Sequence, residues 1–124
     1  MSNAPLTLWQ ILLLGAYAIG MSGGQVLFKM AALRSPEAAG GIGERLFGLL
    51  FNVYFIAAVM LYAGFAILWV WILTFIPLSR AYPFIALAFA LTPLLGGLLF
   101  GDIISLRLVA GVLLILCGLF LVTS

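Results

Sequence analysis

The chain has 124 residues, of which 67% are hydrophobic and only 6% are charged. A soluble domain carries about 25% charged residues, so this composition excludes a water-facing surface over most of the molecule. The chain has no histidine and one cysteine, which excludes an internal disulfide and a His/Cys metal cluster, and its formal charge of +2 is too small to indicate a nucleic-acid partner.

Four stretches lack Asp, Glu, Lys and Arg altogether, namely residues 1–28, 46–79, 81–101 and 108–124. A bilayer core about 30 Å thick needs about 20 apolar helical residues to cross it. The sequence therefore predicts an all-α, polytopic membrane protein that forms one domain, residues 1–124. Its four transmembrane helices are expected at about 6–33, 47–75, 80–100 and 106–123. The first stretch lacks a basic n-region and is too long for a signal peptide.

Three connections join these helices. Residues 34–45, "RSPEAAGGIGER", form a polar loop with a short interfacial turn expected at its end. Residues 76–79 and 101–105 are short turns, so neighbouring helices should be antiparallel.

The basic residues predict the orientation of the helices in the membrane. Those on the side of loops 34–45 and 101–105 are Lys29, Arg34, Arg45 and Arg107. Arg80 alone lies on the other side. Cytoplasmic loops carry an excess of Lys and Arg, so loops 34–45 and 101–105 are expected in the cytoplasm and both termini outside.

The first helix carries Ala16, Gly20 and Gly24 at four-residue intervals, a stripe that lets another helix approach. Packing within the monomer is favoured over a subunit contact. Gln25 lies beside the stripe and must find a hydrogen-bond partner, on a neighbouring helix or in a polar cavity. Lys29 either snorkels to the headgroups or faces a phosphate or carboxylate.

In the second helix, Asn52 is expected near the inner interface, and Trp69 and Trp71 in the outer aromatic belt. Asp102 precedes the fourth helix, where it is expected to act as a cap or as an anion at the helix N-terminus. It is the one acid outside loop 34–45, so no predicted span contains a carboxylate.

The third helix begins with Arg80, whose planar guanidinium suits phosphate oxygens. Pro83 lies in its first turn, where a missing N–H costs little. Pro93 lies in its middle, followed by two glycines, so a bend is expected there. Such breaks at membrane depth face protein or a cavity, and Tyr82 would lie near the mouth of a substrate path.

The fourth helix has Gly111 and Gly118 seven residues apart on one face. Small residues at this interval form a flat strip, which predicts a dimer interface. Cys117 is interpreted as a small packing residue rather than a reactive thiol.

Three segments together resemble the four-helix, small-multidrug-resistance-like (EamA-like) branch of the drug/metabolite transporter superfamily. They are "GQVLFKMA", "IPLSRAYPFIALAFALTPLLGGLLFGDIIS" and "GVLLILCGLFLV". Small multidrug exporters share Lys29, the Ala81–Tyr82 pair and the glycines of the fourth helix. They depend on a glutamate midway along the first helix, and Met21 stands at that position here. Because a buried carboxylate is what binds both proton and cation, this departure argues against cation/proton antiport.

A second subfamily is more similar, the small paired proteins that flip undecaprenyl-phosphate-linked aminoarabinose. They share Gly24–Gln25, Lys29 and Ala81–Tyr82–Pro83 with this chain. They often have an acid and a proline in the turn between helices three and four; here Asp102 stands for the acid and the proline is absent. The resemblance implies a bacterial inner-membrane protein without a cofactor that acts as a homodimer or as a heterodimer with a paralogue.

The function expected from these features is movement of a polyprenyl-phosphate-linked sugar, or a similar anionic lipid, between leaflets. Lys29 and Arg80 lie toward opposite membrane faces, so one is expected to capture the phosphate and the other to release it. The side chains expected to hydrogen-bond sugar hydroxyls are Ser22, Gln25, Ser79 and Tyr82.

Three other functions stay open at this point. One is a multidrug-type exporter of small molecules, whose partner would supply the missing acid. Another is an accessory subunit of a membrane complex. The third, an enzyme, is the least favoured, because the chain has no histidine, no intramembrane acid pair and no metal-ligand spacing.

Overall fold

A computed structural model describes residues 6–34 and 41–123. Its helices are α1 (Leu8–Arg34), α2 (Ile42–Leu50), α3 (Val53–Leu73), α4 (Leu78–Ala81), the 3-10 turn η1 (Tyr82–Phe84), α5 (Ile85–Phe100) and α6 (Leu106–Thr123). Among the described residues, four segments are long and apolar enough to cross a membrane: α1, α3, α6, and Leu78–Phe100, which combines α4, η1 and α5. The predicted all-α fold with four spans is confirmed.

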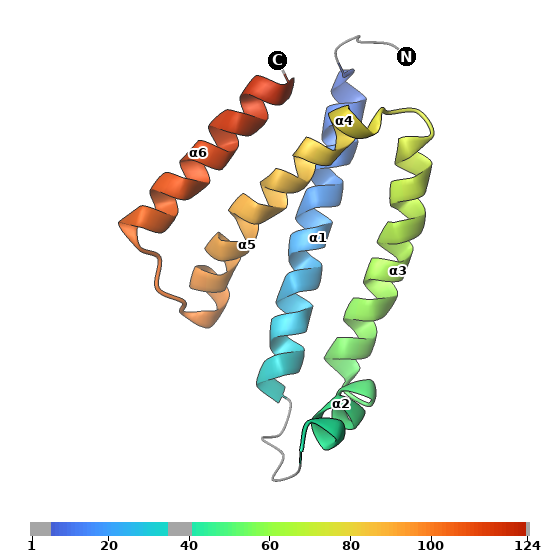
Figure 1. Ribbon diagram of the computed structural model, residues 1–124, viewed down its shortest axis with the longest axis vertical. Coiled ribbons are helices and arrows are strands. Elements are labelled where there is room, and N and C mark those ends of the chain that lie inside the picture. The colour runs from blue at the N-terminus through green and yellow to red at the C-terminus, as the bar shows by residue number, and fades with distance from the viewer. Residues whose placement is uncertain (1–5, 35–40, 124) are drawn as a thin grey trace.

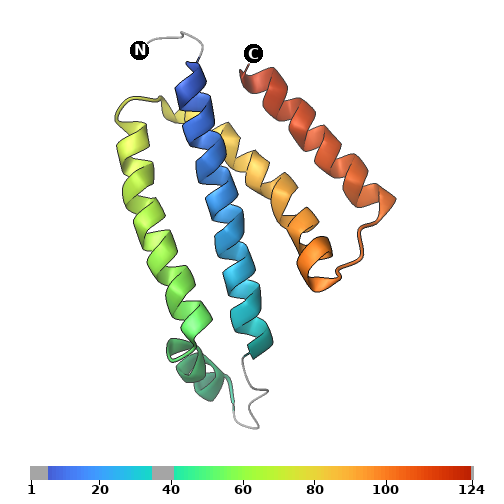
Figure 2. The same ribbon diagram turned by 180° about the vertical axis from the view of Figure 1, so that it is seen from behind.

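The four spanning helices lie side by side in a single layer. α1 packs against α3 on one side and α5 on the other, and α6 packs against the far side of α5 (Figure 1). α3 and α6 are therefore the two edges, as the view from behind also shows (Figure 2). α4 lies at the end where α1 begins and α6 ends, here called the α4 end. α2 and residues 101–105 lie toward the opposite end, the α2 end.

A cluster of buried apolar side chains holds the α4 end together. Its fully or almost fully buried members are Leu14, Tyr17, Ile72, Ile76, Ala81 and Phe84. They come from α1, from the end of α3, from the turn that follows it and from the α4–η1 segment, so these segments share one core. α6 buries only Val112. The layer is thus well packed between α1 and α3 and more open toward α6.

Two glycines of the small-residue stripe face α3. A Cβ at Gly24 would lie 2.7 Å from the Tyr62 ring, and a Cβ at Gly20 would collide with the Phe65 ring. The predicted use of the stripe for packing within the monomer is confirmed for these two glycines. Ala16 is exposed and takes no part in this contact.

The expected second helix, 47–75, is interrupted near its start. Residues up to Leu50 belong to α2, and Asn52 caps the separate helix α3 by accepting hydrogen bonds from the backbone N–H groups of Tyr54 and Phe55 at 3.0 and 3.3 Å. An asparagine side chain competes for the first N–H groups of a helix, so it starts a new helix within an apolar run. Asn52 Nδ2 also donates to the Ala31 carbonyl of α1 at 3.0 Å.

α2 is short and amphipathic. Its large apolar side chains, among them Leu46, Phe47 and Leu50, are exposed, and Glu44 and Arg45 lie in the same helix. Such a helix suits the membrane interface, with its apolar face toward the acyl chains. The short interfacial turn expected at the end of loop 34–45 is therefore a two-turn helix.

The two tryptophans of α3 have different surroundings. Trp69 is half-buried between the rings of Tyr17 at 5.2 Å and Tyr82 at 6.4 Å. Trp69 thus packs toward α1 and η1, and its place in the outer aromatic belt stays a prediction. Trp71 is 52% exposed and meets Phe75 edge-on, with ring centroids 4.8 Å apart.

The prolines of the third span differ in their effect on the helix. Pro83 lies in η1, where the span changes from α4 to α5 through a 3-10 turn. Pro93 lies inside α5, which stays α-helical on both sides of it. A proline removes the N–H that would bond the carbonyl four residues earlier, which here belongs to Phe89. The bend at Pro93 stays a prediction.

Candidate functional site

Two adjoining cavities lie along α1 and α5. The larger, of about 430 Å³, is lined by Met21 and Gln25 of α1, Tyr62 of α3, and Phe89, Thr92 and Pro93 of α5, among others. The smaller, of about 260 Å³, is lined by Lys29, Gly96, Phe100 and Asp102, among others. Gln25, Thr92 and Pro93 line both. The two cavities together are called the α1–α5 groove below.

The groove changes from apolar to charged along α1. Met21, Gln25 and Lys29 follow at four-residue intervals and so lie on one side of the helix, about 6 Å apart along its axis. Residue 21 is the middle of α1. With α1 centred in a core about 30 Å thick, Lys29 lies about 12 Å from the midplane, just inside the hydrocarbon. A lysine at this depth beside a cavity is a candidate functional residue.

Gln25 both bonds a neighbouring helix and lines a cavity. Its Nε2 donates to the Tyr62 hydroxyl at 2.9 Å, and that hydroxyl donates to the Met21 carbonyl at 2.9 Å. The two alternatives expected for Gln25 thus occur together. Tyr62 was not predicted as a site residue, because a tyrosine within an apolar span gives no sign of which helix it faces.

Ser22 was expected to contact substrate, but the structure buries it completely. Its hydroxyl donates to the Ala18 carbonyl at 3.2 Å and accepts from Thr92 at 3.2 Å. Ser22 therefore ties α1 to α5 and lines neither cavity of the groove. Thr92, which was not predicted, lines both cavities.

Asp102 lies in the groove rather than at the start of α6. Gly101 ends α5 with a φ of +70°, a conformation that favours glycine, and the Asp102 N–H then donates back to the Gly96 carbonyl at 3.3 Å. The Asp102 carboxylate lies against Gly96, where Oδ2 would be 2.6 Å from a Cβ. The expected capping role is wrong, because the Ser105 hydroxyl accepts the Leu108 N–H at 3.1 Å and caps α6 instead.

The remaining predicted residues form a second group at the α4 end. Ser79 and Arg80 lie in α4, and Tyr82 begins η1. Tyr82 is 58% exposed and meets the Trp69 ring edge-on. The structure thus brings Gln25 and Lys29 together in the groove and places Ser79, Arg80 and Tyr82 at the α4 end, away from it.

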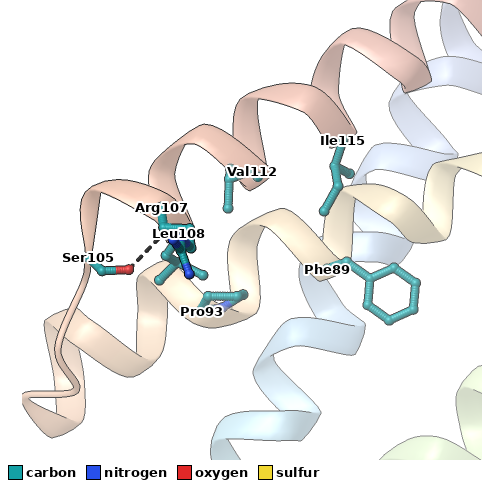
Figure 3. A pocket seen from close by; sticks show the side chains of 8 residues that line it. Phe89, Pro93, Ser105, Arg107, Leu108, Val112 and Ile115 are labelled. Carbon is teal, nitrogen blue, oxygen red and sulfur yellow. Dashed lines mark hydrogen bonds between the residues drawn. The ribbon is translucent and has the colours of Figure 1, made fainter.

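A further cavity of about 390 Å³ lies between α5 and α6 (Figure 3). Gly111 lines it, together with Ser105 and Arg107 at the α2 end. Phe89 and Pro93 line this cavity as well as the groove, and the Phe89 ring points away from α6. Gly118, the second glycine of the predicted dimer interface, is exposed.

Four apolar spans in one layer, with a groove that ends in a lysine, define a small multi-pass membrane protein. The chain is 38% identical over 96 residues to the probable 4-amino-4-deoxy-L-arabinose-phosphoundecaprenol flippase subunit ArnE of Sodalis glossinidius (strain morsitans). The matched region covers 77% of this chain and 79% of that protein. The chain belongs to the ArnE family, as the resemblance of its motifs predicted. No family model and no solved structure matches it.

Proposed function

We propose that this chain is one subunit of a flippase that moves a polyprenyl-phosphate-linked amino sugar between the leaflets of a bacterial inner membrane. The observation that carries the proposal is the α1–α5 groove, which has an apolar middle at Met21 and a cation, Lys29, at its α2 end. The similarity to a protein named as a flippase subunit gives the substrate class. The protein is thus a transporter of a lipid rather than an enzyme that alters it.

The phosphate is the part of the substrate that is least able to cross the membrane without a binding partner in the protein. A phosphate is costly to bring into hydrocarbon unless it is paired with a cation. Lys29 meets it at the α2 end of the groove, and Arg80 meets it near the opposite membrane face, where a guanidinium pairs well with phosphate oxygens. One cation captures the headgroup and the other releases it.

The sugar is held by neutral polar groups. A glutamine side chain has two N–H donors and one acceptor, so its bond to Tyr62 leaves Gln25 able to bond sugar hydroxyls. Thr92 lines the same cavities from α5. Ser79 and Tyr82 take this role at the α4 end. Ser22 supports the site through its bond with Thr92.

The polyprenyl tail stays in the lipid. Exposed side chains such as Gln25 and Phe89 line the groove, so it is open along its side. The headgroup therefore slides along α1 while the tail remains among the acyl chains, and no wide pore is needed.

Orientation and assembly complete the proposal. The excess of basic residues at the α2 end supports an orientation with loops 34–45 and 101–105 in the cytoplasm and both termini outside. α6 buries only Val112 within the monomer. A second subunit, identical or paralogous, covers this edge, with Gly111 and Gly118 at or near the contact.

The multidrug-exporter alternative requires a carboxylate in the middle of the groove, and this chain has none there. Met21, which stands at the position of the exporters' glutamate, lines the middle of the groove. A thioether binds neither a proton nor a cation in the way a carboxylate does. A partner subunit would have to supply that acid.

Native mass spectrometry of the protein extracted with its own lipids tests the proposal. The variants are Lys29→Gln and Arg80→Ala, and Arg45→Gln in α2 is the control for loss of a positive charge. We expect a polyprenyl-phosphate sugar bound to the wild type and to the control, with less bound to each of the other two. Bulk phospholipid alone in all four samples would contradict the proposed function.

A further inference from the structure

We infer that Asp102 determines which headgroup the groove accepts, by pairing its carboxylate with a primary ammonium group on the sugar while Lys29 holds the phosphate. The inference rests on the proposed function and deepens it. It assigns the groove to zwitterionic headgroups, in which an anion and a cation stand on opposite sides of a sugar ring.

The end of α5 places the carboxylate on the groove wall. Gly101 turns the chain back through its positive φ, and the Asp102 N–H bonds the Gly96 carbonyl at 3.3 Å. Gly96 has no side chain, so Asp102 Oδ2 lies where a Cβ would be only 2.6 Å away. The position of the carboxylate therefore depends on two glycines, one that turns the chain and one that leaves space.

The groove then has opposite charges on two different helices. Lys29 of α1 and Asp102, just after α5, line the same cavity of about 260 Å³. Within the described part of the chain, no ion pair joins them. Both charges are therefore available to a ligand that lies between the helices.

A glycosyl phosphate with an amino group across the ring matches this arrangement. The name of the similar protein gives a 4-amino-4-deoxy sugar joined to phosphoundecaprenol. In a six-membered sugar ring, C4 lies opposite the anomeric carbon that carries the phosphate. Lys29 and Asp102 thus meet the two charged ends of such a headgroup, and Gln25 and Thr92 line the same cavity.

The carboxylate acts chiefly through selectivity. Hydrogen bonds between ionised partners are stronger than those between neutral groups. A headgroup without the ammonium leaves Asp102 near the substrate phosphate with no compensation, which penalises the wrong ligand. Capping of α6 does not explain the position of the Asp102 carboxylate, because Ser105 caps that helix.

Binding of two synthetic lipids to the purified full chain in nanodiscs tests the inference. One lipid is undecaprenyl phosphate bearing the 4-amino sugar, and the other is the same lipid with its amine acetylated and therefore neutral. Charge-assisted hydrogen bonds are strong enough that we expect the wild type to prefer the free amine by about tenfold or more.

Variants of the protein test the contributions of the Asp102 and Lys29 charges separately. Asp102→Asn is expected to weaken binding of the free-amine lipid and to relieve the penalty on the acetylated lipid, so that the two lipids bind about equally. Gly96→Ala, which displaces the carboxylate, is expected to reduce the preference in the same direction. Lys29→Gln is expected to weaken binding of both lipids, and Glu44→Gln, which removes a carboxylate from α2, to change neither.

The outcomes distinguish this inference from the proposed function. Equal binding of both lipids by the wild type, or an unchanged preference in Asp102→Asn, would overturn the role of Asp102 and leave the flippase intact. Binding of neither lipid by the wild type would overturn the proposed function together with the inference.

Discussion

Gln25 donates a hydrogen bond to the Tyr62 hydroxyl at 2.9 Å, so a polar side chain of α1 is held in place by α3. The same hydroxyl donates onward to the Met21 carbonyl at 2.9 Å. One tyrosine thus sets the rotamer of the amide that lies where the two cavities of the groove meet.

Replacing Tyr62 with phenylalanine should loosen Gln25 without emptying the space beside Gly24. A hydrogen bond between membrane helices contributes about 0.6 to 2 kcal/mol, so we expect a loss of stability of about that size. We also expect weaker binding of the sugar lipid. Thermal unfolding in detergent and a lipid-binding titration measure the two effects. Tyr54→Phe is the control; an equal loss of lipid binding in both variants would contradict the role of the Tyr62 hydroxyl.

Adjacent glycines of α1 should respond oppositely to a methyl group. A Cβ at Gly24 would lie 2.7 Å from the Tyr62 ring, whereas nothing lies within 4 Å of a Cβ at Gly23. Overpacking costs about 1 to 3 kcal/mol, and alanine gains up to about 1 kcal/mol over glycine in a helix. We expect Gly24→Ala to lower the melting temperature and Gly23→Ala to hold or raise it. Similar melting temperatures for the two variants would show that Tyr62 moves away without cost.

Asn52 fastens α3 to α1 and caps α3, and two substitutions separate these roles. Asn52→Asp keeps the oxygen that accepts from Tyr54 and Phe55 but loses the donor to Ala31. Loss of an N-cap costs about 0.5 to 2 kcal/mol, so Asn52→Ala should be the less stable variant. Thermal unfolding of both proteins checks the order. If Asn52→Asp were as unstable as Asn52→Ala, the bond to Ala31 would be the dominant contribution.

A carboxylate in the middle of the groove should oppose an anionic lipid. Met21→Glu places a negative charge one helical turn from Gln25 and two from Lys29. At a pH high enough to ionise the new carboxyl, we expect it to weaken binding of the phosphate lipid severalfold, because like charges in a poorly solvated site repel. Met21→Gln is the neutral control of similar size. Equal binding of the lipid by the two variants would show that the phosphate does not pass this point.

The single cysteine reports on the proposed dimer contact. Cys117 is exposed on α6, next to Gly118. If α6 meets α6 of a parallel partner along the strip that contains Gly118, mild oxidation in membranes should produce a disulfide-linked dimer. Cys117→Ala should abolish the cross-link, and Gly118→Leu should reduce it by separating the helices. A dimer that forms without any cross-link would place the contact elsewhere.

The sequence was most informative where residues act locally. The four charge-free stretches predicted the spans, and the rule that intramembrane glutamine needs a partner predicted a bond for Gln25. The break between α2 and α3 was missed because residues 46–79 contain no charge. Asn52 ahead of an apolar run was nevertheless a capping signal that marked the break.

Contacts between distant parts of the chain were not predictable in the same way. Tyr62 and Thr92 lie 37 and 67 residues beyond Gln25 along the chain, and only the packing of α1 between α3 and α5 brings them together. Asp102 turned back onto α5 rather than forward onto α6. The Gly101–Asp102 pair offered a clue, since glycine just past an apolar helix often ends it in the left-handed conformation.

The single-layer arrangement of the helices affects how the protein responds to substrates of different size. In a closed bundle, a polyprenol would have to be threaded through the protein, and each added isoprene unit would meet a further obstacle. In this layer the groove is open at its side, so the protein contacts and recognises only the headgroup. The number of isoprene units should therefore have little influence on the rate of transport, and short, soluble-tailed analogues should report faithfully on headgroup recognition.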